Sequence, residues 1–185
     1  YDSISNAAID DNLDNSFGLY MFSSSKFYEL DGQGTMDYLA RFSDEMKGTD
    51  AWQTMNKVGE GKLLVADGQP YIDFTQATPD GAELSLKSVV ENPANKYVLL
   101  DFWASWCGPC MMLSPVVAEI AGELDGQVKV GKVNVDEQPE LAAAFRVESI
   151  PLLVVVKDGV IHKQELGYRS KEDIFDMLGI YPDIK

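Results

Sequence analysis

Cysteine and histidine are scarce in this chain of 185 residues, which has only two cysteines and one histidine. A structural zinc site usually takes four cysteine or histidine ligands. The sequence has no second cysteine pair and no cluster of histidines to complete such a set, and His162 lies by itself on a predicted strand. We therefore expect no metal site.

Long apolar runs are missing as well. No stretch of the sequence is long and apolar enough to span a bilayer. The chain begins with Tyr1 rather than methionine, and we interpret it as a mature or trimmed form from which a signal or lipid anchor has been removed.

Basic residues are few compared with acidic ones. The sequence has 15 lysines and arginines against 30 aspartates and glutamates, which gives a formal net charge of −15 at pH 7. This charge argues against direct binding of nucleic acid or anionic lipid. Apolar residues make up 45% of the chain, which is enough for a hydrophobic core.

Both cysteines lie in one tetrapeptide, Cys107-Gly108-Pro109-Cys110, directly after the apolar, β-prone run 97–103. On the first turn of a helix, side chains three residues apart share a face, so the two sulfurs can meet. Unpaired N–H groups and the helix dipole favour a thiolate at Cys107. Pro109 fits this turn because its missing N–H has no partner to lose.

The spacing predicts dithiol–disulfide exchange. We expect Cys107 to attack a substrate disulfide and form a mixed disulfide, which Cys110, deeper and less exposed, resolves by attacking Cys107. The residues by themselves also allow an inert structural disulfide, although a bridge across so short a loop restricts the unfolded chain little.

Hydrophobic periodicity predicts an α/β protein in two parts, 1–65 and 66–185, with glycines around 61–68 between them. In the first part we expect helices at 11–22, 35–46 and 51–58, whose methionine and aromatic stripes form a core. In the second part we expect these strands and helices: strands at 71–74, 83–86, 97–103, 128–135, 152–157 and 160–166, and helices at 108–124, kinked by Pro115, 139–145 and 171–178. Such alternation indicates parallel pairs at the sheet centre, with the dithiol at the carboxyl end of a central strand.

The segment from Val98 to Cys110, with its sequence VLLDFWASWCGPC, resembles the active-site segment of the thioredoxin superfamily nearly residue for residue. Further matches follow in the family's order: Lys132 to Asp136, Pro139, Ser149-Ile150-Pro151, the hairpin 155–160 and Gly167. The resemblance covers the chain from about Ala66 onward. It implies a thioredoxin fold, with a central mixed sheet flanked by helices, and a redox-active disulfide Cys107–Cys110 in place of any cofactor.

The resemblance implies that Asp101 accepts a proton from Cys110 and that Lys132 is a charge near Asp101. Asp101 lies in a strand otherwise built of Val, Leu and Phe, where burial is expensive and should raise its pKa. An aspartate facing water at a strand edge and an ordinary solvated lysine are the alternatives.

The resemblance also implies a substrate-binding surface, made of Trp106, Gly108, Pro109, Ile150, Pro151 and Gly167. Trp106 would be an apolar lid beside the Cys107 sulfur, or simply an exposed aromatic. Pro151 is implied to be cis, presenting the backbone of Ile150 to an extended substrate; an ordinary trans proline is the alternative. Met111 occupies a position where the family commonly has Lys or Arg. Ile150 occupies a position where reducing members usually have Thr, and the residue at this position affects the reduction potential and the direction of electron flow.

The first part of the chain has a resemblance of its own. Residues 10–16 and 66–74 look like the segment leading into TlpA- and ResA-like proteins, which are envelope-tethered thiol reductases. In that group 71–75 and 83–86, joined through Pro79-Asp80-Gly81, would be an extra β-hairpin extending the sheet edge. The compact lengths of 128–136 and 137–147 are instead thioredoxin-like.

Together these features predict a periplasmic or cell-envelope thiol–disulfide oxidoreductase that reduces disulfides in exported proteins. Its partners would be proteins with disulfides and an electron-donor protein, either thioredoxin reductase or a membrane thiol transporter. The alternatives are a general cytoplasmic thioredoxin fed by a flavoprotein reductase, and a non-catalytic module that binds a partner. A thiol peroxidase usually has Thr or Ser three positions before its cysteine, where this chain has Ala104.

Overall fold

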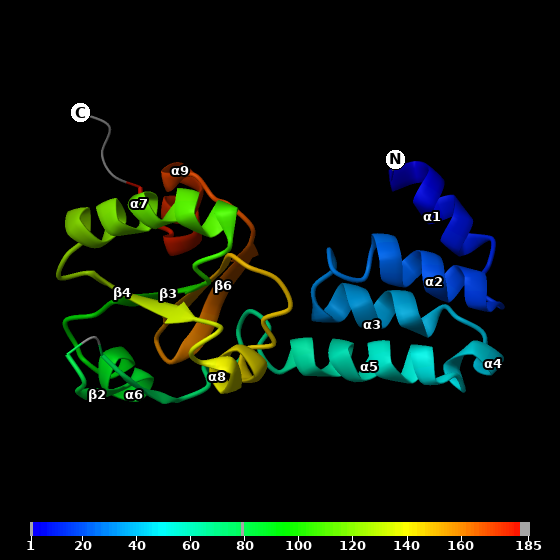
Figure 1. The fold of residues 1–185 in the computed structure, drawn as a ribbon, viewed down its shortest axis with the longest axis horizontal. Helices are drawn as coiled ribbons and strands as arrows, with labels where there is room; N and C mark the ends of the chain where they lie inside the picture. The colour runs from blue at the N-terminus through cyan, green and yellow to red at the C-terminus, as the bar shows by residue number, and fades with distance from the viewer. Residues whose placement is uncertain (1, 79, 182–185) are drawn as a thin grey trace. The chain divides into compact units, whose positions relative to one another are not determined.

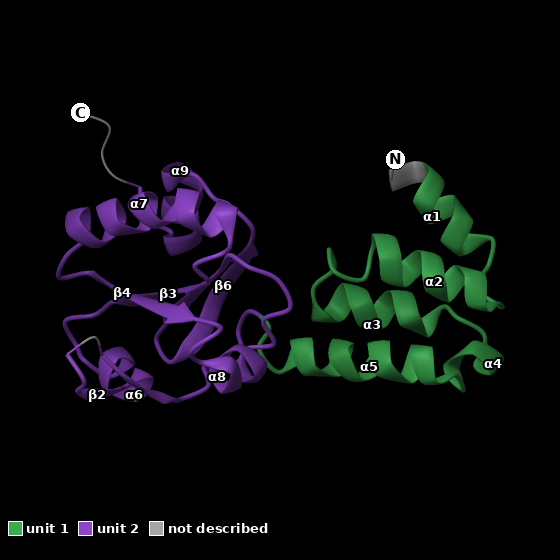
Figure 2. Cartoon of the chain, viewed as in Figure 1, with its two compact units in different colours: residues 1–66 green, residues 67–185 purple. Residues whose placement is uncertain are grey.

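The computed structural model describes residues 2–78 and 80–181 (Figure 1). The chain divides into two compact units, residues 1–66 (unit 1) and residues 67–185 (unit 2) (Figure 2). The division lies one residue beyond the boundary that we expected from the sequence, after residue 65.

Unit 1 is helical. Its helices are α1 (Asp2–Asp10), α2 (Ser16–Ser25), α3 (Gly32–Ala40), α4 (Asp44–Lys47) and α5 (Asp50–Leu63). Helix α1 was not predicted, and α5 is longer than the helix that we predicted at 51–58. The predicted helices at 11–22 and 35–46 have wrong bounds, and the reason is local capping.

Short polar side chains set these bounds. The Asn15 side chain accepts hydrogen bonds from the N–H groups of Phe17 and Gly18, so α2 begins only after Asn15. The Ser43 side chain accepts one from the N–H of Met46, which starts α4 as a separate helix. A polar cap inside an apolar periodic run therefore divides what periodicity alone joins.

The core of unit 1 is rich in aromatic residues. Phe22, Leu39 and Phe42 are almost completely buried, and the Phe22 ring stacks on Tyr38 with centroids 4.9 Å apart. Helix α2 passes very close to the preceding loop at Gly18, because a Cβ added there would lie 2.0 Å from the backbone oxygen of Asn12. The prediction that these stripes form a core is confirmed for Leu39, Phe42 and Met46, whereas Phe17 and Tyr20 of the predicted helix at 11–22 are 51% and 65% exposed.

Unit 2 is built on a four-stranded mixed sheet in the order β4-β3-β5-β6. Its strands are β3 (Tyr97–Trp103), β4 (Val128–Asn134), β5 (Leu152–Lys157) and β6 (Val160–Leu166). Strand β3 pairs in parallel with β4 and antiparallel with β5, and β5 pairs antiparallel with β6. These strands confirm the predicted ones to within a residue.

Helices cover both faces of this sheet. In Figure 1, α7 (Gly108–Glu123) and α9 (Lys171–Leu178) lie over one face, and α6 (Leu86–Val90) and α8 (Pro139–Ala144) lie over the other. Helix α7 continues through Pro115 to Glu123. The kink that we expected at Pro115 stays a prediction.

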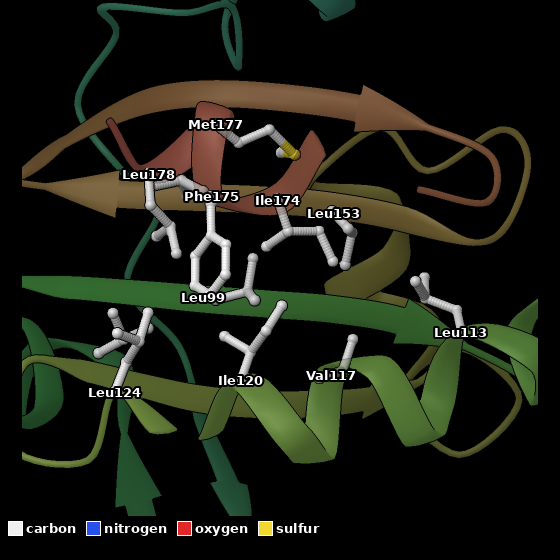
Figure 3. Packing of buried hydrophobic residues seen from close by; sticks show 12 residues of the cluster. Leu99, Leu113, Val117, Ile120, Leu124, Leu153, Ile174, Phe175, Met177 and Leu178 are labelled. Carbon is white, nitrogen blue, oxygen red and sulfur yellow. The ribbon is translucent and has the colours of Figure 1, made fainter. Parts of the chain in front are cut away.

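The main core of unit 2 lies between the sheet and the pair α7 and α9 (Figure 3). Val117 and Ile120 of α7 and Ile174 of α9 pack against Leu99 of β3 and Leu153 of β5, and all five are at most 1% exposed. Burial on this scale favours folding by about 1.5–3 kcal/mol for each large apolar side chain. This core packs β3 against α7, whose N-terminal end carries the cysteine pair.

The predicted strand at 71–74 is wrong, because these residues form no strand. The Phe74 carbonyl instead accepts a hydrogen bond from the N–H of Leu86, and the Asp73 carboxylate accepts one from the N–H of Lys87, both 2.8 Å long. The backbone there is thus tied to the start of α6, a helix that we did not predict.

The hairpin lies later than predicted, with β1 (Thr75–Ala77) antiparallel to β2 (Glu83–Ser85). It forms its own two-stranded sheet, so the prediction that it extends the main sheet edge is wrong. Pro70 makes a single bridge to Val160 of β6. In the turn, Asp80 and Gly81 are described, whereas Pro79 lies outside the described residues.

Candidate active site

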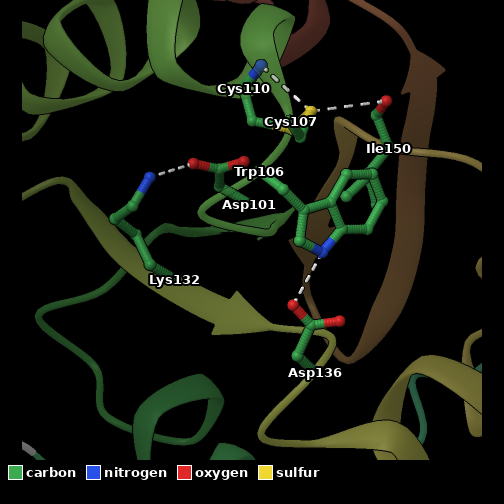
Figure 4. Close-up of a disulfide and its surroundings, with 7 residues drawn as sticks. All are labelled: Asp101, Trp106, Cys107, Cys110, Lys132, Asp136 and Ile150. Atoms are coloured by element: carbon green, nitrogen blue, oxygen red, sulfur yellow. Dashed lines mark hydrogen bonds and ion pairs between the residues drawn. A yellow bond between two sulfur atoms is a disulfide. The ribbon is translucent and has the colours of Figure 1, made fainter.

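The two cysteines form a disulfide at the start of α7 (Figure 4). Their Cα atoms are 5.3 Å apart. Cys107 is the N-cap residue of the helix, and the backbone N–H of Cys110 points at its Sγ across 3.2 Å. Cys107 is 5% exposed and Cys110 is 1% exposed, which confirms that Cys110 is the less exposed sulfur. After reduction, this N–H and the helix dipole would stabilise a thiolate at Cys107.

Strand β3 positions this helix start at the carboxyl edge of the sheet. The strand ends at Trp103, whose carbonyl accepts a 2.9 Å hydrogen bond from the N–H of Val135, directly beyond β4. Gly108 and Pro109 occupy the first turn of α7 and are exposed beside the disulfide. The structure thus places both residues at the protein surface next to the disulfide.

Asp101 and Lys132 lie directly opposite each other on β3 and β4. The Asp101 side chain is 1% exposed, and its Oδ2 forms an ion pair with the Lys132 ammonium group. The other carboxylate oxygen, Oδ1, is buried without a hydrogen-bond partner among the described residues. The alternative of a water-facing aspartate is therefore wrong, and so is that of an unpaired, solvated lysine.

Burial raises the pKa of the Asp101 carboxyl group above its usual value, and the hydrogen bond and charge of Lys132 oppose this rise. In the view of Figure 4, the carboxyl group lies between Lys132 and the disulfide. The site therefore contains a buried carboxyl group that can exchange a proton at higher pH than an exposed aspartate.

Trp106 is 69% exposed, and its indole Nε1 donates a 2.8 Å hydrogen bond to Oδ2 of Asp136. The structure thus places Trp106 beside Cys107 with a fixed orientation (Figure 4). We had given Asp136 no role from the sequence. Its position two residues after β4, at the same sheet edge as the cysteines, was the signal that could have pointed to it.

The Ile150–Pro151 peptide bond is cis, as predicted. The Ile150 carbonyl oxygen lies 3.8 Å from Sγ of Cys107. Gly167, which has a left-handed φ of 89°, donates its N–H to the Pro151 carbonyl over 2.8 Å. The structure thus brings Ile150, Pro151 and Gly167 together at one side of the disulfide.

The described part of the chain holds no group of three or more His, Cys, Asp or Glu residues placed to bind a metal ion. Across these same residues, every helix is too short or too polar to cross a membrane.

Comparison with known proteins connects this geometry to a family. The thioredoxin family model matches residues 81–179, more than half of the chain. A thioredoxin of Staphylococcus haemolyticus is 47% identical over 88 residues, which is 48% of this chain and 85% of that protein. A thioredoxin of Listeria monocytogenes is 46% identical over 84 residues (45% and 82%), and thioredoxin 2 of Chlorobaculum tepidum is 44% identical over 81 residues (44% and 74%).

The matched region holds the sheet, the disulfide at the start of α7 and the cis-proline loop. Family membership implies substrates with disulfides and a reductase that regenerates the dithiol. The chain belongs to the thioredoxin family and is a thiol–disulfide oxidoreductase with Cys107 and Cys110 as its active-site pair.

Proposed function

We propose that this protein reduces disulfides in exported proteins, with Cys107 as the attacking sulfur. The observation that carries the order of attack is the N-cap position of Cys107, where the Cys110 N–H lies 3.2 Å from its Sγ. A thiolate is stabilised at that position by the N–H group and by the helix dipole. Cys110 is buried behind it and serves as the resolving sulfur.

The reaction starts from the dithiol. The Cys107 thiolate attacks one sulfur of the substrate disulfide, and the other substrate sulfur leaves as a thiolate and takes a proton. Cys110 then loses its proton and attacks Cys107, which releases the second substrate sulfur. Two electrons have passed to the substrate, and the protein is left with the Cys107–Cys110 disulfide seen in the structure. A reductase returns two electrons and two protons.

We assign Asp101 as the group that takes the proton from Cys110. A general base works best when its pKa lies near the working pH, and burial moves the pKa of Asp101 in that direction. Lys132 holds the ionised carboxylate through the ion pair with Oδ2, which limits the rise. The free Oδ1 of Asp101 is the atom that remains to receive a proton.

The substrate-binding surface is proposed to consist of Trp106, Gly108, Pro109, the Ile150–Pro151 loop and Gly167. An extended substrate that hydrogen-bonds to the Ile150 backbone, in the manner of strand addition, would bring its sulfur to Cys107. The 3.8 Å separation between the Ile150 carbonyl and Cys107 Sγ supports this placement. Recognition through main-chain atoms depends little on substrate sequence, so any sequence preference would come from the side chains around the disulfide.

We place the protein in the periplasm or cell envelope, with a membrane thiol transporter as electron donor. The resemblance of residues 10–16 and 66–74 to TlpA- and ResA-like reductases supports this assignment, and so does the lack of a third cysteine that could mispair in an oxidising space. A second candidate, a general thioredoxin served by a flavoprotein reductase, is favoured by the close match to proteins named thioredoxin.

A redox titration followed by tryptophan fluorescence tests the direction of electron flow. We expect a reduction potential near about −270 mV, and one near about −120 mV would overturn the proposed reducing role. Labelling Cys107 in intact cells with a membrane-impermeant thiol reagent tests the location. Rapid turnover with a flavoprotein reductase, together with protection from that reagent, would establish the second candidate instead.

A further inference from the structure

Large apolar side chains are exposed close in sequence to the disulfide and to the loop that contacts it. Trp106, Met111, Met112 and Tyr168 are between 44% and 69% exposed. Trp106 precedes Cys107, and the two methionines follow Cys110 in α7. Tyr168 follows Gly167, which is hydrogen-bonded to the cis-proline loop. Methionine side chains are flexible and polarizable, so they adapt to partner side chains of different shapes.

The same face carries negative charge. The four segments that present the site, 104–112, 135–138, 148–151 and 167–168, contain three acidic residues and no basic residue. The acidic residues are Asp136, Glu137 and Glu148, and all three are exposed.

Two basic residues close in sequence to the four segments are held by other partners. Lys132 is ion-paired with the buried Asp101. Arg169 is held by Oε2 of Glu165 at 2.7 Å and by the carbonyl of Tyr168. Arg146 lies near segment 148–151, but its single positive charge leaves the net charge of the four segments negative. Helix α7 has no basic residue along its whole length. A substrate disulfide therefore approaches through a negative potential.

Long basic side chains fit both properties of this face. Lysine and arginine lay an apolar stem along an apolar surface while the charged head stays in water. A stem packed on Trp106 would leave its head near the carboxylate of Asp136, to which Trp106 is hydrogen-bonded. An acidic flank would meet the same carboxylate as a like charge, which suppresses binding.

We propose that this face selects substrate disulfides whose cysteines are flanked by lysine or arginine. The inference rests on the proposed function, because it concerns the substrates that the Cys107 thiolate attacks. It names the substrate class by its local charge, whatever the protein that contains it.

Three peptides with one disulfide in the same loop, flanked by Lys, Ser or Glu, test the inference. Protein reduced with dithiothreitol and freed of excess reagent is mixed with each peptide, and a single turnover is followed by tryptophan fluorescence. Each rate constant is divided by that of the same peptide with dithiothreitol alone, which removes the effect of the flanking charge on intrinsic reactivity. We expect a Lys-to-Glu ratio of about 10 at low ionic strength. The ratio should fall toward 1 in 1 M salt, where charges are screened beyond about 3 Å.

Substitutions on this face test whether it causes the difference in rate between the Lys-flanked and Glu-flanked peptides. Met111→Lys and Glu137→Gln should each lower the Lys-to-Glu ratio severalfold. Glu83→Gln, which removes the same charge from β2 instead of a site segment, should leave it unchanged.

The outcomes separate the two proposals. If the reduced protein reacts with none of the peptides, the proposed function fails. If it reacts with all three at equal normalised rates, or if the preference persists undiminished in 1 M salt, the proposed function stands and this inference is overturned.

Discussion

The indole Nε1 of Trp106 donates a 2.8 Å hydrogen bond to Oδ2 of Asp136, a residue 30 positions later in the chain. The bond joins the loop before Cys107 to the loop after β4. Trp106 is mostly exposed, so little else of the protein holds its ring in place. We therefore propose that Asp136 positions the Trp106 indole beside Cys107.

Loss of this bond should weaken substrate binding. Asp136→Ala should raise KM roughly fivefold for a Ser-flanked disulfide peptide while kcat changes little, because a hydrogen bond of this kind contributes about 1 kcal/mol. Trp106→Phe removes the indole N–H that donates this hydrogen bond, so the Phe variant is the control in which to repeat the Asp136 substitution. In that background Asp136→Ala should have no further effect on KM; additive effects would show that the two residues act independently.

Trapping the mixed disulfide with substrate distinguishes the roles of the Cys107 and Cys110 sulfurs. Cys110→Ser should accumulate a mixed disulfide between Cys107 and the substrate, because the resolving thiol is missing. Cys107→Ser should form no such adduct, since Cys110 is 1% exposed. Mass spectrometry of the protein after mixing with a disulfide peptide reads out both. An adduct on Cys110 in the second variant would contradict the proposed order of attack.

Asp101, the proposed proton acceptor, should act only on the second step, in which Cys110 attacks Cys107. Asp101→Asn should slow resolution of the mixed disulfide by about 100-fold, the usual contribution of a general base, and leave the first attack unchanged. In the wild-type protein the resolving rate should rise with pH as Asp101 ionises, at a pKa above its usual value. Stopped-flow fluorescence over a pH series measures both phases. An Asn variant that keeps this pH profile would rule out the assignment.

The same carboxyl group should make stability depend on pH. Because burial raises the pKa of Asp101 in the folded state, the folded protein binds more protons than the unfolded chain at pH values between the unfolded and folded pKa. The free energy of unfolding should therefore fall as pH rises through this window and then stay level. Asp101→Asn should lack this fall and gain about 1 kcal/mol at pH 8, where an unpaired buried carboxylate oxygen costs most.

Urea unfolding curves at pH 5.5 and pH 8 measure this gain. A stabilisation of the Asn variant that is larger at pH 5.5 than at pH 8 would contradict the sign of the shift.

Two glycine substitutions in helices should have opposite effects. Gly18→Ala in α2 should destabilise unit 1 by more than about 1 kcal/mol, because the new Cβ meets the Asn12 backbone oxygen at 2.0 Å. Gly122→Ala in α7 has no atom within 4 Å of its new Cβ, and it should gain about 0.5–1 kcal/mol from helix propensity. Thermal unfolding followed by circular dichroism compares the two. Equal effects would show that the contact at Gly18 relaxes freely.

The centre of unit 2 could be predicted because its local and global signals agree. The run from Tyr97 to Trp103 is apolar enough to be a buried strand wherever it lies, and Pro109 in the cysteine motif that follows suits the first turn of a helix. Asp101 was identifiable as a buried acid because its neighbours on the strand are apolar. The resemblance supplied the cis bond at Pro151, which no local pattern indicates.

The errors concern features that depend on competing partners. Periodicity joined residues 11–22 because it does not register that the Asn15 side chain competes for backbone N–H groups. The segment 71–74 has strand-like residues, but hydrogen bonds from Leu86 and Lys87 hold its backbone elsewhere. Asp136 was missed as a partner of Trp106 because the two residues are 30 positions apart and the parallel pairing of β3 with β4 brings them together.

The pairing of Asp101 with Lys132 has a consequence for how the chemistry of this protein can change. The two side chains face each other because β3 and β4 are aligned in one particular register, and a slip by a single residue would turn one of them to the opposite face of the sheet. An insertion or deletion within either strand would therefore abolish the acid–base pair, even if every loop and both sulfurs stayed in place.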